Sequence, residues 1–261
     1  MALYDRNLTR FPHPSPHLSL LAKNPSLHFL PDTDLWWPSY SFRQETGLFI
    51  GEDFFYGSGK FQVRYFVPKE CVLMKPDETE DANMEILEMN VKFLPADWKR
   101  NVLDGYLAAG HLRFMVGCLH FTAEVEGPPA FVHGGATFTA FDQLLGVLVH
   151  YYNLYIPHMT LTLTIDYKRP MPLSGTQYYK IWIEKIEGKK VFVEGYIFDM
   201  DLLENETELD VATADFEKVN VPPALRRAEI RGIFFRIGES NGKDGLAYLE
   251  EEKGRTARPK L

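Results

Sequence analysis

The sequence predicts an α+β fold in which an antiparallel sheet curls around one central helix. Two observations predict it: an unusually apolar helix over about Gly135–Tyr152, and strand-like segments on both sides of that helix that are joined by turn residues. With 261 residues, of which 45% are hydrophobic, the chain is long enough for one large domain or for one domain with a sizeable extension.

The predicted helix is apolar on nearly every face. Its apolar residues are Ala136, Phe138, Ala140, Phe141, Leu144, Leu145, Val147, Leu148, Val149, Tyr151 and Tyr152. A helix of this kind must be buried on all sides. A single antiparallel sheet can bury one helix by curling around it, and this arrangement is called the hotdog fold.

Strand-like segments lie before and after this helix. Leu112 to Val125 is an apolar run ahead of it, and Thr160 to Tyr167 alternates polar and apolar side chains after it. This alternation is typical of a half-buried strand. Pro170 and Pro172 end the pattern, because proline has no N–H to donate to a neighbouring strand.

A β-hairpin and a last strand are expected after these prolines. Tyr178–Ile186 and Val191–Met200 are its arms, and Glu187-Gly188-Lys189-Lys190 is its turn. Asp201–Glu208 is polar and is expected to be a loop, and Leu209–Val219 is expected to be the last strand. The predicted order is therefore a strand, the helix and then a meander of antiparallel strands.

The predicted hotdog domain spans residues 111–221, with an extension on each side. Residues 1–110 form an N-terminal extension, in which Leu48–Val67 has the pattern of a hairpin and residues 83–110 contain helical segments that can cap the sheet. Residues 222–261 form a C-terminal extension whose Gly-, Glu- and Lys-rich end is expected to be mobile.

Charge and cysteine content exclude several classes of protein. The net charge of −8 and a pI near 5.5 argue against a nucleic-acid partner, since that affinity depends on Lys and Arg. Cys71 and Cys118 lack C-x-x-C spacing, which argues against a disulfide scaffold and fits a reducing, cytoplasmic location. A weak excess of basic residues near the N-terminus leaves a mitochondrial transit segment open as the alternative.

No membrane span, metal or cofactor is predicted. The chain has no apolar stretch of the roughly 18 residues that a spanning helix needs. His13, His17 and His28 have no ligand-like spacing, so they predict no metal site.

The candidate site begins at His133-Gly134-Gly135, which follow the Pro-rich loop Glu126–Val132. Two adjacent glycines at a helix start leave backbone N–H groups facing the helix N-terminus, where they can hold a carbonyl oxygen or an anion. Asp142 is the single carboxylate of the apolar helix. Desolvation by its apolar neighbours is expected to raise the pKa of this carboxyl, which suits a base or a nucleophile.

The helical rise separates the two halves of this site. Gly135 and Asp142 are seven residues apart, which is about 10 Å along a helix and too far for both to contact one carbonyl. Two copies that pack antiparallel across a two-fold axis bring the N-terminus of one helix beside the middle of the other. We therefore predict an obligate homodimer, or a dimer of dimers, with active sites shared between subunits.

Three motifs in this order resemble those of the PaaI-type hotdog acyl-CoA thioesterases, most closely their mitochondrial long-chain branch. The motifs are Glu126–Ala136, Asp142 at nine residues after His133, and Thr160–Pro170. The resemblance covers about 110 residues, from Leu112 to Val219. It implies a dimeric thioesterase that acts on an acyl-CoA or an acyl-carrier-protein.

The resemblance also implies roles for residues after the helix. It makes Thr160 a hydroxyl that helps place the water or the Asp142 carboxylate. It places Tyr167, Lys168 and Arg169 beside the pantetheine and nucleotide end of coenzyme A.

Purely structural roles for these residues stay open. His133 can be a general acid or base, or an imidazole that only caps or bonds the backbone, whereas Asp142 can be a structural acid of the interface. Thr160 can reflect strand propensity, and Phe138 can belong to the core or line an acyl tunnel. Two other functions also stay open: dehydratase- or cyclase-like chemistry on a thioester-bound or polyketide substrate, and non-catalytic acyl binding.

Overall fold

The computed structural model describes residues 16–30, 61–69, 110, 112–152, 158–173 and 175–236. Three expectations lie outside these residues: the first arm and turn of the hairpin at 48–60, the helical segments over 83–109, and the mobile end of the C-terminal extension.

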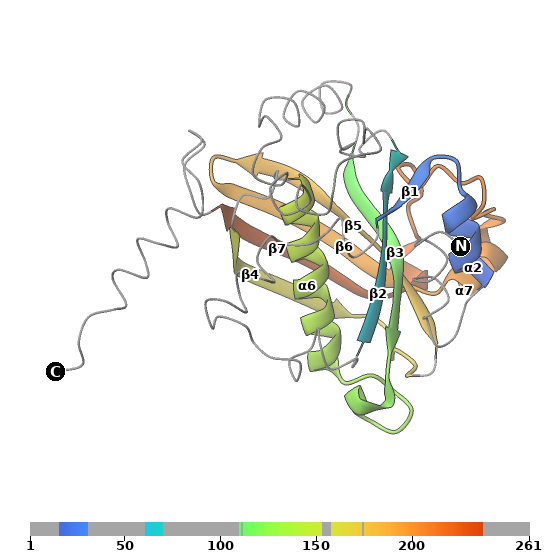
Figure 1. Ribbon diagram of the computed structural model, residues 1–261. Coiled ribbons are helices and arrows are strands. Elements are labelled where there is room, and N and C mark those ends of the chain that lie inside the picture. Colours follow the sequence, from blue (N-terminus) through green and yellow to red (C-terminus); the bar gives the residue numbers. More distant parts are fainter. Residues whose placement is uncertain are drawn as a thin grey trace, which may run out of the picture.

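Seven strands form one antiparallel sheet in the order β1-β2-β3-β5-β6-β7-β4 (Figure 1). Their bounds are β1 Leu27–Leu30, β2 Phe61–Pro68, β3 Arg113–Phe121, β4 His158–Tyr167, β5 Thr176–Glu187, β6 Lys190–Phe198 and β7 Arg226–Arg236. Strand β4 follows the central helix in the chain, yet it lies at one edge of the sheet and pairs with β7.

Helices cover both faces of the sheet (Figure 1). Helix α6, Gly134–Tyr152, crosses one face, and α2, Pro16–Lys23, and α7, Met200–Thr207, lie on the other. Short 3-10 turns occur at Ala123–Val125 and Pro223–Leu225. The predicted α+β hotdog arrangement, a sheet against a long apolar helix, is confirmed. Among the helices that the structure describes, none has the length and hydropathy needed to cross a bilayer.

Strand β3 is apolar without alternation because both of its faces are covered. Met115 and Leu119 pack toward α6, whereas Phe114 and Val116 pack on the side of α2. All four side chains are buried. The sequence therefore predicts this strand from its apolar run, but does not reveal the second layer of helices.

Gly117 is required where β3 passes its neighbours. A Cβ there would collide with the carbonyl oxygen of Arg64 and would come within 2.6 Å of the Tyr179 hydroxyl. That hydroxyl donates to the Arg64 carbonyl at 2.8 Å. The absent side chain leaves room for a buried hydrogen bond that ties β5 to β2.

The hairpin predicted after the prolines is confirmed as β5 and β6. Glu187 pairs with Lys190, so the connection is the two-residue loop Gly188-Lys189. Gly188 has φ 57°, in the left-handed region that glycine enters without strain.

Two expectations for the segment after this hairpin are wrong. The loop expected at Asp201–Glu208 is helix α7, whose N-cap Asp199 accepts from Leu202 N–H at 3.3 Å. The strand expected at Leu209–Val219 is a series of turns. Asp210 and Asp215 each accept a hydrogen bond from the main-chain N–H two residues on, and this local bonding competes with a strand.

The last strand is β7, and it lies inside the sheet between β6 and β4. It places Ala228, Ile230 and Phe234 in the core that α6 covers. Strands β1 and β2, from before residue 111, pair beside β3. The sheet therefore draws strands from both sides of residues 111–221.

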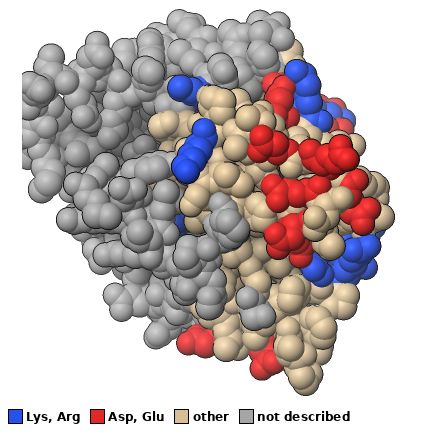
Figure 2. Space-filling view, turned by 90° about the vertical axis from the view of Figure 1, so that its right-hand side faces the viewer, with Lys and Arg blue, Asp and Glu red and all other residues tan. Residues whose placement is uncertain are grey.

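The sheet face that carries α2 and α7 is covered by these helices and by residues 209–221, and its outer surface is acidic (Figure 2). Asn24 donates to the carbonyls of Val211 and Ala214, both at 2.9 Å, and so holds residues 209–221 over the sheet. Exposed carboxylates on this part of the chain include Asp201, Glu206, Glu208, Asp210 and Asp215. Their negative charge disfavours phosphate-bearing ligands on this face.

Candidate active site

The loop before α6 is folded back on itself by main-chain hydrogen bonds. Gly127 N–H donates to the Phe131 carbonyl at 2.9 Å, and His133 N–H donates to the Val125 carbonyl at 2.8 Å. A Cβ on Gly127 would come within 2.8 Å of the His133 Cα, so only glycine fits this close approach. The loop therefore sets His133 directly ahead of the helix.

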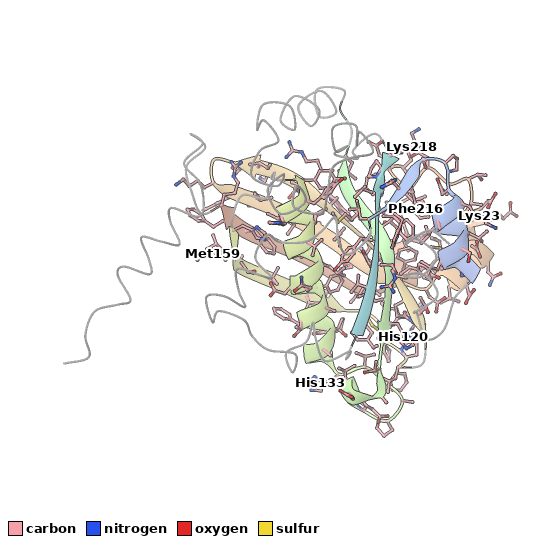
Figure 3. The ribbon with its side chains drawn as sticks, viewed as in Figure 1. Lys23, His120, His133, Met159, Phe216 and Lys218 are labelled. Atoms are coloured by element: carbon pink, nitrogen blue, oxygen red, sulfur yellow. The ribbon has the colours of Figure 1, made fainter. Side chains whose placement is uncertain are left out.

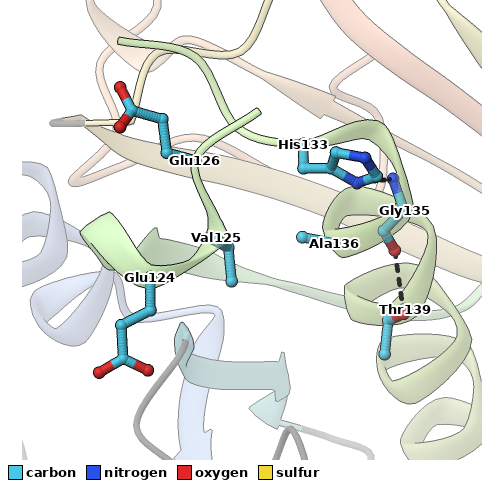
Figure 4. Close-up of a pocket in the computed structure, with 7 residues that line it drawn as sticks. All are labelled: Glu124, Val125, Glu126, His133, Gly135, Ala136 and Thr139. Carbon is cyan, nitrogen blue, oxygen red and sulfur yellow. Dashed lines mark hydrogen bonds between the residues drawn. The ribbon is translucent and has the colours of Figure 1, made fainter. Parts of the chain in front are cut away.

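His133 caps α6 (Figure 4). The Gly135 N–H donates to the His133 Nδ1 at 3.0 Å, and the Ala136 N–H donates to the His133 carbonyl at 2.9 Å. The imidazole also lies against Gly135, since a Cβ there would be 3.0 Å from Nδ1. The geometry thus agrees with the capping interpretation of His133, and one of the two glycine donors predicted from the sequence is occupied by this imidazole.

Tyr167 reaches the same helix end from β4. Its hydroxyl donates to the Gly134 carbonyl at 2.6 Å, and a Cβ on Gly134 would meet its ring at 3.4 Å. Partial burial raises the pKa of Tyr167, which keeps the phenol protonated as a donor. The structure therefore brings Tyr167 together with Gly134 at the start of the helix.

Asp142 lies half-buried on the side of α6 that faces away from the core. The Thr160 Oγ1 of β4 donates to its Oδ1 at 2.8 Å. Phe141, Leu144 and Leu145 are fully buried in the core. These sequence neighbours therefore do not enclose the carboxylate, and the complete burial of α6 expected from its sequence is wrong on this side.

The two halves of the predicted site stay apart within one chain. Gly135 and Asp142 lie on one continuous helix, α6, so the separation of about 10 Å is retained. The structure joins Asp142 to Thr160, and Gly134 to Tyr167, as two separate clusters.

Lys168 and Arg169 follow the end of β4. The Lys168 Nζ lies 3.1 Å from the Glu229 Oε2 and 4.0 Å from the Asp166 Oδ2. These carboxylates, which the sequence analysis missed, offset the positive charge of Lys168. The side chain of Arg169 is exposed, and its main-chain N–H donates to the Arg227 carbonyl at 3.1 Å.

A shallow hollow of about 430 Å³ opens beside the helix start (Figure 4). Its lining residues are Glu124, Val125, Glu126, His133, Gly135, Ala136 and Thr139. Glu124, shortly before the glycine motif, was not predicted as a neighbour of the site, whereas Glu126 belongs to the Pro-rich loop identified from the sequence. The hollow is open to solvent, which leaves room for the imidazole to move.

The most exposed large apolar side chains of the described residues lie on α6, on β4 or in the loop before α6. They are Phe131 38%, Phe138 37%, Met159 48%, Leu161 50% and Tyr167 52% exposed. Figure 3 labels His133 at one end of α6 and Met159 on the side of the molecule where β4 lies.

A cluster of side chains that could bind a metal, and one cysteine thiol, lie away from this site. Ligand-type atoms of His17, Asp201 and Glu204 lie within 4.8 Å of one another, the one such group in the described part of the chain. The His17 Nε2 is 2.5 Å from the Glu204 Oε2, so the pair joins α2 to α7. Cys118 is fully buried, and burial raises the pKa of its thiol to about 12, which makes it a poor nucleophile.

Residues 130–204 match the family model described as "Thioesterase superfamily". This segment contains both glycines, Asp142 and Thr160. The resemblance to the thioesterase superfamily is confirmed over these residues.

Curated relatives match a similar length of this chain. "Acyl-coenzyme A thioesterase THEM4" of Xenopus laevis is 42% identical over 95 residues, which are 36% of this chain and 40% of that protein. The Rattus norvegicus protein of the same name is 38% identical over 96 residues, 37% of this chain and 39% of its own length. The match therefore spans about two fifths of these relatives.

Among solved structures, the E. coli PaaI protein from the phenylacetic acid degradation operon is 18% identical to this chain. The alignment covers 52% of this chain and 85% of that one, with a TM-score of 0.35.

Proposed function

We propose that this protein hydrolyses the thioester bond of an acyl-CoA, or of an acyl-carrier-protein, at a site shared by two copies of the chain. The observation that carries the proposal is the Thr160–Asp142 hydrogen bond on the outward side of α6. It presents an oriented carboxylate where a second helix N-terminus can approach. The matched relatives, named acyl-coenzyme A thioesterases, support this substrate class.

In the proposed reaction, Asp142 acts on the acyl carbon. Its carboxylate either takes a proton from a water that adds to the thioester carbonyl, or adds to that carbon itself and is released by water. The Thr160 hydroxyl holds one carboxylate oxygen and leaves the other free to react. In the first route the C–S bond breaks after water has added, and the leaving thiolate takes up the proton that Asp142 removed. In the second route the thiolate leaves as the acyl–Asp142 anhydride forms, before water hydrolyses that anhydride. Both routes give a carboxylate and a free thiol.

The glycines of the partner copy stabilise the charge that develops on the carbonyl oxygen. Backbone N–H groups at a helix N-terminus suit this role because the helix dipole adds positive potential there. Gly135 supplies the main donor and Gly134 the second. We assign His133 to capping Gly135, because its Nδ1 accepts from the Gly135 N–H in the free protein, and we assign the proton transfer to Asp142 and not to His133.

The substrate is proposed to lie along the same surface. Phe138, exposed on α6, contacts the acyl chain, and Tyr167 and Arg169 border the pantetheine and nucleotide end of coenzyme A. Lys168 contributes less to phosphate binding, because Glu229 and Asp166 offset its charge.

A homodimer accounts for the exposed groups of β4 and α6. An edge strand presents unpaired main-chain groups, and Met159 and Leu161 add exposed apolar surface along it. Antiparallel packing of two α6 helices would cover this surface and complete two identical sites. The buried, unpaired thiol of Cys118 fits the reducing, cytoplasmic location that we infer.

Release of free thiol from a panel of acyl-CoAs of different chain length tests the proposal. We expect wild-type protein to release thiol, and Asp142→Asn to lower the rate at least about 100-fold while leaving the dimer intact. Asp201→Asn, an exposed carboxylate on α7, is the matched control and should retain the wild-type rate. Wild-type activity in Asp142→Asn would refute the assignment, and ligand binding without thiol release would favour the non-catalytic alternative.

A further inference from the structure

The donor that the proposed reaction requires is already occupied in the free protein. The Gly135 N–H donates to the His133 Nδ1 at 3.0 Å, and the ring lies directly beside the glycine. A thioester oxygen needs the same N–H. The substrate and the imidazole therefore compete for one hydrogen bond.

The imidazole can leave this position without disturbing the fold. Its side chain is exposed and lines the open hollow beside Glu124 and Glu126 (Figure 4). The main chain of His133 is held independently, because its N–H donates to Val125 at 2.8 Å and its carbonyl accepts from Ala136 at 2.9 Å. A rotation of the side chain alone is enough to release the glycine.

We propose that His133 is a displaceable cap on the oxyanion donor, a positioning residue that closes Gly135 in the free protein and gives way to the substrate carbonyl. This inference rests on the proposed thioesterase function and adds a regulation of the same site. A hydrogen bond of this kind contributes enough to weaken carbonyl binding by about 2- to 12-fold. The cap also shields the helix start while no substrate is bound.

Two coenzyme A analogues test the proposal by binding alone. One is a ketone in which CH2 replaces the thioester sulfur, so it keeps the carbonyl, and the other is an S-alkyl thioether without a carbonyl. We expect His133→Ala to bind the ketone about 2- to 12-fold more tightly than wild type and the thioether equally well. His133→Asn, which keeps an acceptor at the cap, should behave as wild type. An equal effect on both analogues, or weaker ketone binding by His133→Ala, would overturn the proposal.

A readout without ligand keeps the test independent of folding and of turnover. The Gly135 amide proton, followed by NMR, should exchange with solvent more slowly in wild type than in His133→Ala, because the imidazole accepts its hydrogen bond. Equal exchange rates in the two proteins rule out the cap. Failure of the thioesterase function would instead appear as wild-type protein that releases no thiol, whatever the Gly135 amide does.

Discussion

At the scale of single residues, the hydroxyl of Thr160 is the group that orients Asp142. We expect Thr160→Val to lower kcat about tenfold or more and to change KM little, because a charge-assisted hydrogen bond to the carboxylate that we propose as the reacting group is lost. Thr160→Ser keeps the hydroxyl and serves as the control. Steady-state thiol release checks both variants, and equal rates for the two would show that Thr160 only supports the strand.

The burial of Lys180 leads us to expect that the free energy of unfolding depends on pH. Its side chain is 5% exposed, and its Nζ donates to the carbonyls of Val219 at 2.7 Å and Glu217 at 3.1 Å. Desolvation lowers the pKa of Lys180 from 10.5 to about 8, although the Glu217 and Asp215 carboxylates oppose the shift. Between these two values the unfolded chain binds more protons than the folded one.

The free energy of unfolding should therefore rise as the pH increases from about 8 toward 10.5. Lys180→Met removes the titrating group, keeps most of the apolar stem and should flatten this rise. Urea unfolding of both proteins at several alkaline pH values measures the difference, in which the titration of other groups cancels. Parallel curves would mean that Lys180 keeps its ordinary pKa in the fold.

At the scale of secondary-structure elements, the close contacts of β3 give a stability prediction. Gly117→Ala places a Cβ against the Arg64 carbonyl and the Tyr179 hydroxyl in the interior of the sheet. Overpacking of this kind destabilises by about 1–3 kcal/mol. Thermal or urea unfolding of the variant measures this loss, and unchanged stability would mean that β2 and β5 separate at little cost.

The elements that the sequence predicts are those whose pattern is local. Helix α6 follows from its two glycines and its apolar composition, and the β5–β6 hairpin follows from two strand-like runs with Gly188 in the turn between them. Leu209–Val219 was wrongly predicted to be a strand because its apolar residues suit one. The side chains of Asp210 and Asp215 instead accept hydrogen bonds from the main chain two residues on. Strand β7 was missed because the predicted domain ended at residue 221 and the strand follows at Arg226–Arg236.

At the scale of the whole molecule, the layer of α2 and α7 is what the sequence does not show. It covers the second face of the sheet through contacts between distant segments, such as Asn24 with Val211. Patterns within one segment carry no information on such a pairing. The candidate site was more predictable, because the distance between Gly135 and Asp142 depends only on helical rise. The sequence did not show that Asp142 faces away from the core or that the His133 side chain caps the helix, because these depend on packing and rotamers.

The two faces of the molecule differ in what they offer to a partner. The α2–α7 face is covered and acidic, whereas the α6–β4 face carries the exposed apolar side chains and both halves of the proposed site. This asymmetry favours association through α6 and β4. A site shared between two subunits, as proposed, would give a result with mixed dimers that a site within one chain cannot give.

Heterodimers of two different variants distinguish a site shared between subunits from a site within one chain. Asp142→Asn disables the carboxylate, and Gly135→Pro removes the N–H donor, a change that the first turn of a helix tolerates. Each variant alone should be inactive. In a purified heterodimer of the two, one site would combine wild-type Gly135 from the first subunit with wild-type Asp142 from the second, so about half of the wild-type activity should return. A site within a single chain would leave both sites of that heterodimer defective, and the activity would stay at the level of the single variants.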